Sequence, residues 1–551
     1  MIIRLWFYII SILSLLAIGF IYLIWPPILY ALVIVLPLIL IGLYDVIQPY
    51  SNVLRNYPVW GHWRYILLSI RPQIQQYFIA TNQSGRPFNK EMRDLVYERA
   101  TGMLDTIPFG TQRDVDVVGY EWINHSLSPK KAHERGARIR IGNSQCTKPY
   151  LASRLNVSAM SFGALSQNAV RALNRGAKIG NFAHNTGEGG LSRYHLMEGG
   201  DIIWQIGTGY FGCKTKDCNF DPELFKEKSR HEHVKMIEIK LSQGAKPAHG
   251  GILPGAKVTQ EIAQARHVDI GEDCISPPAH TAFSTPIGLL EYIQQLRELS
   301  GGKPVGFKLC LGVRSDFMAI CKAMLETKIY PDFITVDGAE GGTGAAPVEF
   351  TDSLGTPLND GLIFVHNCLV GINVREHIRL IASGKIISGF DMASKIALGA
   401  DLCNSARGML FALGCIQSRR CHNNTCPTGI TTQDPYRMFA LSVDKKAPHV
   451  ANFHNATIQS FLEVLGAAGL EHPEQLTPGH VHRRVTDCSE PNYDQIYTYL
   501  PEGSLLEGSN VPDIYQQYWE SSQADEFASL NNAFGKYWRA KKNYYVRKWE
   551  H

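Results

Sequence analysis

Three cysteines close together near residue 420 point most directly to chemistry. Cys415, Cys421 and Cys426 stand in a C-x5-C-x4-C pattern that ends in Pro427, whereas the other cysteines are scattered along the chain. In a reducing compartment, thiols grouped in this way favour a metal or iron–sulfur cluster over disulfides. A zinc ion held by these thiols and His422 is the alternative, although the short cysteine knuckle of structural zinc sites is missing.

A second set of candidate residues lies in or just after short apolar segments. Lys308 stands among apolar neighbours in VGFKLCLG. A lysine on the inner face of a buried strand requires an anion, so this position suggests a function, and an outward-pointing lysine is the alternative. The glycine-rich stretches that contain Asn185 and the pair Gly341-Gly342 would let the backbone approach a flat ligand closely.

Two further loops have the composition of a phosphate-binding site. One contains Ser388 and Gly389, and the other contains Arg407 and Gly408. Small residues let backbone N–H groups reach phosphate oxygens, and an arginine adds a charged fork. Tight turns that need glycine would explain either loop alone, but they explain the pair less well.

The elements that must position these residues alternate between short apolar segments and longer helical ones. Strands are predicted at residues 155–161, 181–190, 236–243, 274–278, 305–312, 333–342, 385–390 and 401–409. Eight strands that alternate with helices predict a (β/α)8 TIM barrel, in which function collects at the carboxyl ends of the strands. A doubly wound open sheet is the alternative, but no G-x-G-x-x-G fingerprint follows the first strand.

The N-terminus predicts a transmembrane helical hairpin over residues 1–45. Residues 5–24 and 28–44 contain no charged side chain, and Trp25-Pro26-Pro27 separates the two runs. About 20 apolar residues suffice for a helix to cross a bilayer, with about 17 as the lower limit. A cleaved signal peptide is the alternative, but no small-residue cleavage site follows the first run.

The basic residues that follow the hairpin predict its orientation. Arg55, Arg64 and Arg71 come soon after Asp45. The positive-inside rule then places the N-terminus and the large catalytic part in the cytoplasm, at a bacterial inner membrane. A reducing cytoplasm also agrees with the clustered thiols.

The rest of the chain is expected to divide into three parts. They are a helical adaptor at residues 46–145, the barrel at 146–440, and a C-terminal extension of helices and loops at 441–551. Basic and aromatic residues alternate in its tail, residues 536–549, which is expected to be a solvated helix or to contact a membrane surface. A net charge of +4 gives no basic footprint for nucleic acid.

From about Leu155 to Asp434 the chain resembles the flavin-binding synthase domain of glutamate synthase. The stretches that carry the resemblance are SAMSFGALS, NTGEGG, QGAKP followed by GILPGAKV, ISPPAH, DGAEGGTGAAP, ALGCIQSRRC and CHNNTCPTGITTQDP. The chain is still more similar to the shorter, membrane-hairpin relatives known as FMN-binding glutamate synthase family proteins, which share the adaptor stretch around SIRPQIQQYF.

The resemblance implies an iron–sulfur cluster and FMN. Cys415, Cys421 and Cys426 correspond to the ligands of a three-iron, four-sulfur cluster (3Fe-4S), in which three thiolates suffice because one corner of the cube lacks iron. Electrons would enter through this cluster from a donor protein or a reductase subunit.

By the same resemblance, FMN would lie across the mouth of the barrel. Met160 and Ser161 would face the isoalloxazine ring, with Asn185 nearby. Lys308 would face the N1/O2 edge, where a positive charge stabilises the anionic reduced flavin. The two loops with phosphate-binding composition would hold the FMN phosphate.

The substrate implied by the resemblance is a 2-oxo acid, classically 2-oxoglutarate, whose imine with ammonia is reduced to an amino acid such as glutamate. Lys246 in QGAKP corresponds to a lysine that contacts the 2-oxo acid. Glu188 lies where the family places a polar contact near that substrate. Lys308, Lys246 and Glu188 are therefore the expected catalytic residues.

The chain also departs from the synthase pattern. Ala248-His249 stands where the synthase has a glycine and a glutamate, and HTAFSTP replaces a different loop after ISPP. The start Met1-Ile2-Ile3 lacks the nucleophilic cysteine of the glutamine-hydrolysing enzyme, so ammonia is expected from solution or from a partner. The alternatives are an FMN barrel acting on another 2-oxo or 2-hydroxy acid, with His249 or His280 as base, and a membrane-anchored electron-transfer or scaffold protein.

Overall fold

A computed structural model of the chain describes residues 2–266 and 268–527. The chain divides into two units, Met1–Glu91 and Met92–His551, and the barrel lies in the second. The basic and aromatic tail at residues 536–549 lies outside the described residues, so its expected membrane contact stays a prediction.

Two apolar helices begin the first unit. Helix α1 (Ile2–Tyr22) and helix α2 (Leu32–Ile47) are joined by a short 3-10 helix (Pro26–Ala31), because consecutive prolines cannot continue an α-helix. Both segments are long and apolar enough to cross a membrane, and very little of their apolar surface is buried within the structure.

The two apolar helices fold back on each other as a hairpin. Gly42 of α2 lies against the ring of Phe7 of α1, where any larger side chain would collide with the ring. Near the start of α1, Arg4 donates a hydrogen bond of 2.9 Å to Asn56 Oδ1, at the end of helix α3 (Asn52–Asn56). Both ends of the hairpin therefore lie on the same side, as an antiparallel pair of membrane spans requires.

Helices also form the segment between the hairpin and the barrel. Helix α4 (Gly61–Ile74) runs into a π-helical turn (Gln75–Ile79), and helix α5 (Lys90–Thr101) follows. The helical spacing of the sequence continues beyond α5, but Gly102 has a φ of 72°, which no α-helix accommodates. Residues 102–120 contain no helix or strand.

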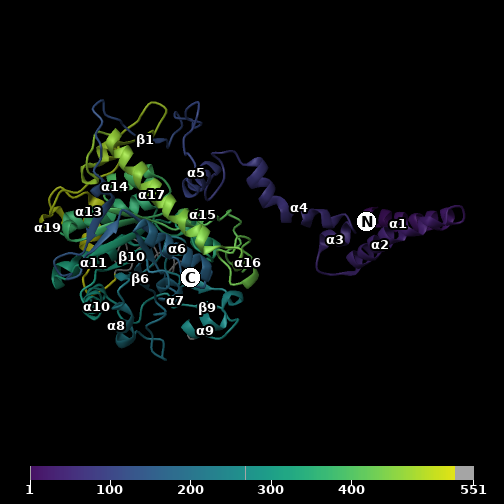
Figure 1. Cartoon of the computed structure of the whole chain (residues 1–551), viewed down its shortest axis with the longest axis horizontal. Helices are drawn as coiled ribbons and strands as arrows, with labels where there is room; N and C mark the ends of the chain where they lie inside the picture. Colours follow the sequence, from purple (N-terminus) through teal and green to yellow (C-terminus); the bar gives the residue numbers. More distant parts are fainter. Residues whose placement is uncertain (1, 267, 528–551) are drawn as a thin grey trace, which may run out of the picture. The chain divides into compact units, whose positions relative to one another are not determined.

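The second unit is built on a closed barrel of eight parallel strands (Figure 1). In barrel order the strands are β4 (Leu155–Val157), β5 (Ala183–Asn185), β6 (Asp201–Ile206), β7 (Val234–Lys240), β10 (Val305–Leu309), β11 (Phe333–Asp337), β12 (Arg379–Ser383) and β13 (Leu402–Ser405). Strand β13 pairs with β4 and closes the ring. The predicted TIM barrel is confirmed.

Two of the predicted strands are wrong, and two barrel strands were missed. Residues 274–278 contribute β9 (Cys274–Ile275), which pairs with β8 (Ile252–Leu253) outside the barrel. Residues 385–390 follow β12 instead of forming a strand, because Lys385 has a left-handed φ of 53°. The missed strands are β6 and β12.

A hairpin closes the amino-terminal end of the barrel. It consists of β2 (Arg138–Ile141) and β3 (Tyr150–Ser153), whose apolar side chains pack against side chains that point inward from the barrel strands. The inward side chains are Ala183, Ile203, Met236, Phe333, Ile381 and Leu402. Because apolar groups fill this end, polar chemistry is left to the opposite end, where the strands terminate.

The longest helix around the barrel comes from the C-terminal extension. Helix α17 (Val443–Ala467) packs on α6 (Gln167–Gly180) and α14 (Gly389–Ala397), as Figure 1 shows. Gly176 of α6 lies so close that a Cβ there would be 2.7 Å from the Cβ of Val450. The extension is thus part of the wall around the barrel.

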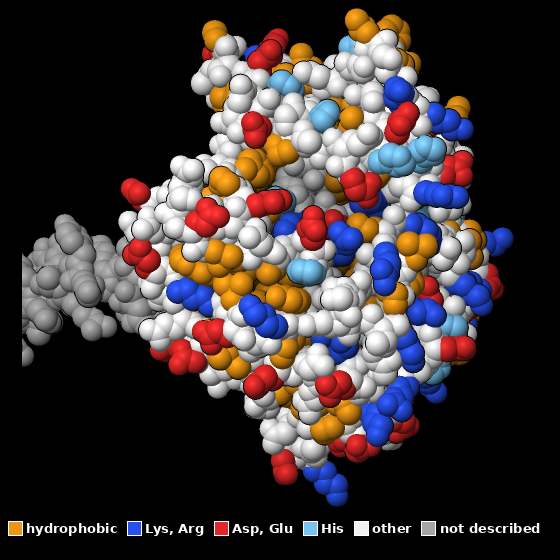
Figure 2. All heavy atoms as spheres, turned by 90° about the vertical axis from the view of Figure 1, so that its left-hand side faces the viewer, with side chains coloured by type: hydrophobic (Ala, Val, Ile, Leu, Met, Phe, Trp, Pro, Cys, Tyr) orange, Lys and Arg blue, Asp and Glu red, His pale blue; other side chains and the backbone are white. Residues whose placement is uncertain are grey.

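The remaining strands and α-helices that the described residues of the second unit form lie around this framework. Strand β1 (Glu121–Ile123) pairs with β14 (Val481–Arg483). The α-helices are α7 (Arg193–Leu196), α8 (Pro222–Ser229), α9 (Gln260–Arg266), α10 (Pro286–Leu299), α11 (Arg314–Thr327), α12 (Val348–Ser353), α13 (Leu358–Gly371), α15 (Arg407–Ala412), α16 (Pro435–Phe439), α18 (Tyr493–Ile496), α19 (Ser504–Glu507) and α20 (Asp513–Ser521). On the face drawn in Figure 2, acidic and basic side chains are interspersed over these elements.

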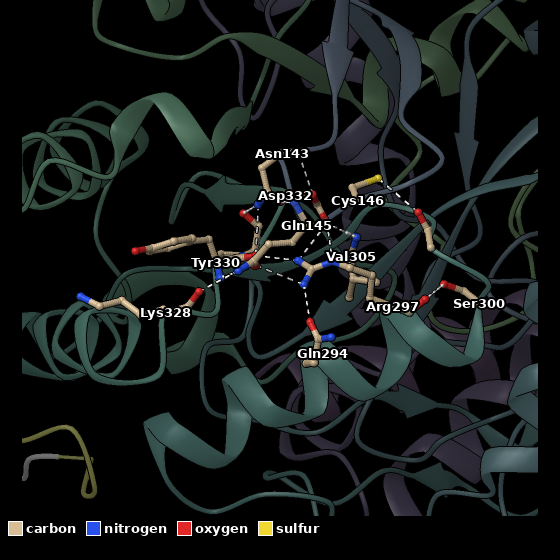
Figure 3. Close-up of polar contacts among 12 residues, drawn as sticks. Asn143, Gln145, Cys146, Gln294, Arg297, Ser300, Val305, Lys328, Tyr330 and Asp332 are labelled. Carbon is tan, nitrogen blue, oxygen red and sulfur yellow. Dashed lines mark hydrogen bonds and ion pairs between the residues drawn. The ribbon is translucent and has the colours of Figure 1, made fainter.

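A buried polar network fastens the elements at the amino-terminal side of the barrel (Figure 3). Asp332 is fully buried, and the Arg297 guanidinium of α10 contacts its Oδ2 at 3.1 Å. The same carboxylate accepts backbone hydrogen bonds of 2.9 Å from Asn143 and from Val305, the first residue of β10. One carboxylate therefore joins the segment after β2, helix α10 and the start of β10.

Removing this carboxylate is expected to destabilise the protein strongly. Asp332→Ala would leave the buried guanidinium and two backbone N–H groups without an acceptor, which costs about 3 to 5 kcal/mol for a buried ion pair. Urea unfolding of the full-length protein in detergent measures the loss. The matched control is Glu471→Ala, since Glu471 pairs with Lys130 at 3.5 Å on the surface and such pairs contribute about 1 kcal/mol or less. Equal losses in the two variants would contradict the assignment.

Candidate functional site

Lys308 lies inside the barrel, at the end where the strands terminate. Its Nζ is 3.3 Å from Asp337 Oδ2 at the end of β11, and both side chains are buried. Burial alone would lower the pKa of Lys308, but Asp337 and Glu238 hold it above its ordinary value. The side chain is therefore a fixed positive charge, and the outward-pointing alternative is wrong.

Asn185 is held by a carboxylate in the middle of the barrel. Glu238 of β7 accepts hydrogen bonds from Asn185 Nδ2 at 2.8 Å, Gln205 Nε2 at 2.6 Å and Thr335 Oγ1 at 2.7 Å. The Asn185 Oδ1 accepts the backbone N–H of Gly187 at 3.0 Å. Asn185 therefore shapes the turn that follows β5, with both ends of its amide engaged.

Glu188 stands in a cluster of buried cations at the same end of the barrel. Its Oε1 is 2.7 Å from Lys240 Nζ, at the end of β7. Burial alone would raise the pKa of Glu188. The positive charge of Lys240, with smaller contributions from Lys246 and Arg266, holds this pKa below its ordinary value. Three cations thus surround one carboxylate, which leaves the cluster with an excess of positive charge.

Lys246 is the cation of this cluster whose charge is most easily lost. Burial lowers its pKa to about 8, against the raising effect of Glu188. Its Nζ donates to the backbone oxygen of Ala345 at 3.2 Å, in the glycine-rich loop that follows β11. Two residues further on, Ala248 has a left-handed φ of 55°, a conformation that glycine adopts without strain. This strained residue stands where the synthase pattern has glycine.

Met160 and Ser161 lie against the turn that Asn185 shapes. Gly187 has a φ of 64°, and a Cβ there would be 2.6 Å from the backbone nitrogen of Ser161 and 2.7 Å from the carbonyl carbon of Met160. Only glycine fits this position. The close approach brings the segment after β4 and the loop after β5 together at the barrel mouth.

The two loops with phosphate-binding composition follow the neighbouring strands β12 and β13. Ser388 caps helix α14, with its Oγ accepting the backbone N–H of Asp391 at 3.1 Å. Gly389 lies against the backbone of α17, and a Cβ on Gly408 would be 2.5 Å from Ser405 Oγ and 3.2 Å from the ring of Phe453 in α17. Local packing therefore explains both glycines without reference to a ligand.

Arg407 supplies the charge expected beside these loops. It is partly buried, and its guanidinium donates to the backbone oxygen of Glu340 at 2.6 Å. Burial lowers the pKa of Arg407 to about 10 in spite of Asp337 and Glu340, so an added anion beside it would be favourable. A Cβ on Gly342 would be 2.9 Å from Arg407 Cδ, and one on Gly341 would be 3.2 Å from Asp337 Oδ2, so both positions require small residues.

The three clustered cysteines lie in the loop after α15. Burial, with smaller contributions from Cys421 and Cys426, raises the pKa of Cys415 to about 12, and these contributions place the three sulfurs in one electrostatic neighbourhood. Burial alone would raise the pKa of Cys426. Hydrogen bonds to its sulfur, of which the one with the Thr428 side chain has the largest effect, hold this pKa below its ordinary value. Among the described residues no group of His, Cys, Asp and Glu side chains is close enough to hold a single metal ion. The thiolates that bind an iron–sulfur cluster lie farther apart than those that bind a single metal ion, because each thiolate binds a different iron atom.

A buried lysine accompanies the cysteine loop. Lys257 donates from Nζ to the backbone oxygen of Ala164 at 3.1 Å, and Cys421 and Cys426 raise its pKa against the larger lowering effect of burial. The adjacent Ala256 accepts a hydrogen bond of 2.9 Å from Asn424 Nδ2. This segment and the cysteine loop are therefore fastened together, with a positive charge beside the thiols.

His280 has little capacity to act as a base. His280 Nε2 contacts the backbone oxygen of Lys240 at 2.9 Å, and its Nδ1 contacts the Tyr210 hydroxyl at 3.1 Å. Burial lowers the pKa of His280 to about 4, so it is neutral with both nitrogens engaged. The geometry thus argues against His280 as the base of a 2-hydroxy acid oxidation. His249 Nδ1 lies 2.9 Å from the backbone oxygen of Gly250, which places the lone pair of a neutral ring on Nε2, so His249 stays the histidine candidate for that alternative.

Sequence reasoning missed five charged residues of this site. Four of them stand in segments that were singled out as motifs or strands, and the five are Glu238, Lys240, Lys257, Arg266 and Asp337. Arg266 ends helix α9, and its guanidinium lies 4.9 Å from the ring centroid of Phe211. An available signal for Glu238 and Lys240 was the apolar run MIEIKLSQ, in which alternating charged residues must face the barrel interior.

Comparison with known proteins gives one matching family and several relatives. The family described as "Conserved region in glutamate synthase" matches residues 121–471. The "Glutamate synthase large subunit-like protein YerD" of Bacillus subtilis is 37% identical over 508 residues, which cover 84% of this chain and 96% of the relative.

Two further relatives match a shorter length of the chain. The "Archaeal glutamate synthase (NADPH)" of Methanocaldococcus jannaschii is 33% identical over 359 residues, or 65% of this chain and 66% of the relative. The "Glutamate synthase (NADH)" of Saccharomyces cerevisiae is 34% identical over 342 residues, or 60% of this chain and 15% of the relative. This chain therefore spans nearly all of the first relative and only a small part of the yeast protein.

Proposed function

The chain belongs to the glutamate synthase family, and from this premise we propose that it is an FMN-dependent oxidoreductase that reduces the imine of a 2-oxo acid to an amino acid. The observation that carries the proposal is the charge at the carboxyl ends of the barrel strands. In one group of cations, Lys308 pairs with Asp337, and burial lowers the pKa of the neighbouring Arg407 to about 10, so an added anion beside that guanidinium is favourable. In the other group, buried Lys240, Lys246 and Arg266 surround the single carboxylate of Glu188, which leaves an excess of positive charge.

The first group of cations fits FMN. Arg407 and the loops with Ser388 and Gly408 would hold the phosphate, for which a guanidinium is a suitable partner. Lys308 would lie against the flavin ring as a fixed charge, and Met160 and Ser161 would provide the backbone against which the ring rests. Bound there, FMN would supply a hydride to the imine carbon of the substrate.

The second group of cations fits a dicarboxylate such as 2-oxoglutarate. Lys246 and Arg266 would bind its carboxylates, while Lys240 keeps Glu188 ionised. Because burial lowers the pKa of Lys246 to about 8, this ammonium can also release a proton to the nitrogen that forms during reduction. Ammonia would come from solution or from a partner protein.

We also propose that Cys415, Cys421 and Cys426 hold a 3Fe-4S cluster that passes electrons from a donor protein or a reductase subunit. Two observations support it: the thiols share one electrostatic neighbourhood, and buried Lys257 stands beside them. A nearby cation offsets the negative charge that three thiolates bring to the cluster. Zinc bound by the same thiols is the alternative that metal analysis tests.

An anaerobic assay tests the proposed reaction. The purified enzyme is photoreduced and mixed with ammonium and a panel of 2-oxo acids that includes 2-oxoglutarate, because Ala248-His249 and the HTAFSTP loop differ from the synthase pattern. Reoxidation of the flavin and formation of the matching amino acid are expected with at least one member of the panel. A flavin that stays reduced with every 2-oxo acid would contradict the synthase activity and leave an electron-transfer role.

We further propose that helices α1 and α2 anchor the protein in a bacterial inner membrane with the barrel in the cytoplasm. Removal of residues 1–45 should move the protein from the membrane fraction to the soluble fraction, since these residues contain most of the two apolar segments. Fractionation in high salt followed by immunoblotting measures the change. A truncated protein that still sediments with membranes would show that another element is the anchor.

A further inference from the structure

We infer that a cavity in the first unit binds the headgroup of a lipid-soluble quinol, which supplies electrons for the reaction proposed above. The cavity has a volume of about 560 Å³ and lies between the last turns of α2 and the first turns of α4. Most of its lining is apolar, and Tyr44 and Trp63 contribute aromatic rings. The inference rests on the proposed function, because it names the source of the electrons which that function consumes.

A histidine–carboxylate pair lies in the wall of this apolar cavity. Asp45 is fully buried near the end of α2, and His62 Nε2 lies 2.9 Å from its Oδ1 and 3.0 Å from its Oδ2. The backbone N–H of Val59 donates to Asp45 Oδ2 at 2.9 Å. The carboxylate thus accepts from both neighbours, so the proton of a neutral imidazole sits on Nε2 and the lone pair on Nδ1.

The lone pair on Nδ1 defines what the cavity can bind. Within the described residues, no hydrogen bond is formed by His62 Nδ1, while the side chain is 42% exposed. A ligand that complements this wall has an apolar body and a neutral hydroxyl that donates to Nδ1. An aromatic hydroquinone has both features, and its ring also suits contact with Tyr44 and Trp63.

Charge argues against the other occupants that a membrane offers. A phospholipid phosphate or a fatty-acid carboxylate would lie beside the buried Asp45 carboxylate, and like charges in an apolar wall repel strongly. An apolar helix from another protein would cover the cavity but leave Nδ1 without a donor. A neutral quinol brings no negative charge beside Asp45 and donates a hydroxyl to His62 Nδ1. It reaches the cavity from the bilayer in which α2 is proposed to lie.

The reaction of the bound quinol balances with the proposed function. Oxidation of a quinol to the quinone releases two electrons and two protons. One hydroxyl proton passes to His62 Nδ1, where Asp45 stabilises the imidazolium, and the other passes to water. The two electrons reduce the proposed FMN, and reduction of one imine consumes the same two electrons.

The first test measures binding in the full-length protein in detergent. Decylubiquinol and menadiol, kept reduced under anaerobic conditions and added to protein whose flavin is already photoreduced, serve as benzoquinol and naphthoquinol probes in isothermal titration calorimetry. His62→Leu removes the acceptor, and Ile66→Trp fills the cavity without touching the ion pair. Each variant should bind about tenfold more weakly or worse than the wild type, at roughly 1.4 kcal/mol per factor of ten. Ile70→Trp, one turn further along α4 and outside the cavity lining, is the matched control and should bind as the wild type does.

The second test separates this inference from the proposed function. Decylubiquinol and menadiol should reduce the flavin of the wild type anaerobically and reduce that of His62→Leu and Ile66→Trp at least about tenfold more slowly. After photoreduction, all variants should react with 2-oxo acid and ammonium at the wild-type rate, since that step does not involve the cavity. The inference would be overturned by unchanged quinol binding in both cavity variants, or by a quinol that binds without reducing the flavin. In either case the reaction of the photoreduced enzyme still tests the synthase activity on its own.

Discussion

Cys421→Ser is expected to abolish binding of iron and acid-labile sulfide while most of the flavin is retained. A serine hydroxyl is a poor ligand for iron, and loss of one of three thiolates leaves the proposed cluster with two. The loops assigned to FMN follow β12 and β13, and neither contains a cysteine ligand, so flavin binding is affected only indirectly. Iron, sulfide and flavin counts on anaerobically purified protein, together with its electron paramagnetic resonance spectrum, measure both effects.

The control for this variant is a thiol that lies apart from the loop. Cys488 is free and exposed, so Cys488→Ser should keep the iron, sulfide and flavin of the wild type. Stoichiometric zinc without iron in the wild type would overturn the cluster and favour the zinc site with His422. Full iron content in Cys421→Ser would exclude this thiol as a ligand.

The barrel could be predicted from the sequence because six of its strands carry clear local signals. The predicted number of strands was right only because two errors cancelled two omissions. Strand β6 (Asp201–Ile206) is buried on both faces, so its apolar residues Ile202, Ile203 and Trp204 are consecutive and lack the alternation that marks a half-exposed strand. Residues 385–390 look like a strand by composition, but a left-handed residue at Lys385 starts a loop there. Backbone conformation at one residue is beyond what composition can specify.

Residues of the candidate site that stand in a recognisable motif could be predicted from the sequence. Residues that belong to the site only because the fold pairs their charges could not. Lys308 was found because a lysine in an apolar strand is conspicuous. Its partner Asp337 and the Glu238 that holds Asn185 come from other strands, and which strands face each other inside the barrel depends on the closed ring. Conversely, Ser388 and Gly389 have local explanations, a helix cap and contact with α17, that the motif could not reveal.

The carboxylate that pairs with the His62 imidazole in the first unit is another partner that the sequence alone could not predict. The apolar runs of the hairpin are visible in the sequence, and Asp45 at the end of the second run reads as a solvated residue beyond the membrane span. The structure instead buries this carboxylate against His62, which lies 17 positions further along the chain. Because the partner is not one helical turn away, no periodicity points to it.

Lys308→Met is expected to reduce turnover with 2-oxo acid and ammonium by about 10²- to 10³-fold, or roughly 3 to 4 kcal/mol in activation free energy, as for the loss of one preorganised group that stabilises developing charge. Methionine preserves the length of the side chain but removes the charge that faces the proposed flavin. FMN content should fall much less, because Arg407 and the phosphate loops are unchanged. The flavin should also become harder to reduce, since the anionic reduced form loses its nearest cation.

A second buried lysine at the opposite end of the barrel provides the matched control. Lys303 donates to the backbone oxygens of Ser229 at 2.6 Å and His231 at 2.9 Å, just before β10 begins. Lys303→Met also removes a buried ammonium, so it should cost stability but leave the flavin midpoint potential unchanged and the turnover of the folded enzyme within about twofold of wild type. A loss of turnover of the same size in both variants would assign the effect to folding. An unchanged midpoint potential in Lys308→Met would remove Lys308 from the flavin site, because a charge held at 3.3 Å from Asp337 inside the mouth cannot lie beside a flavin without affecting its reduction.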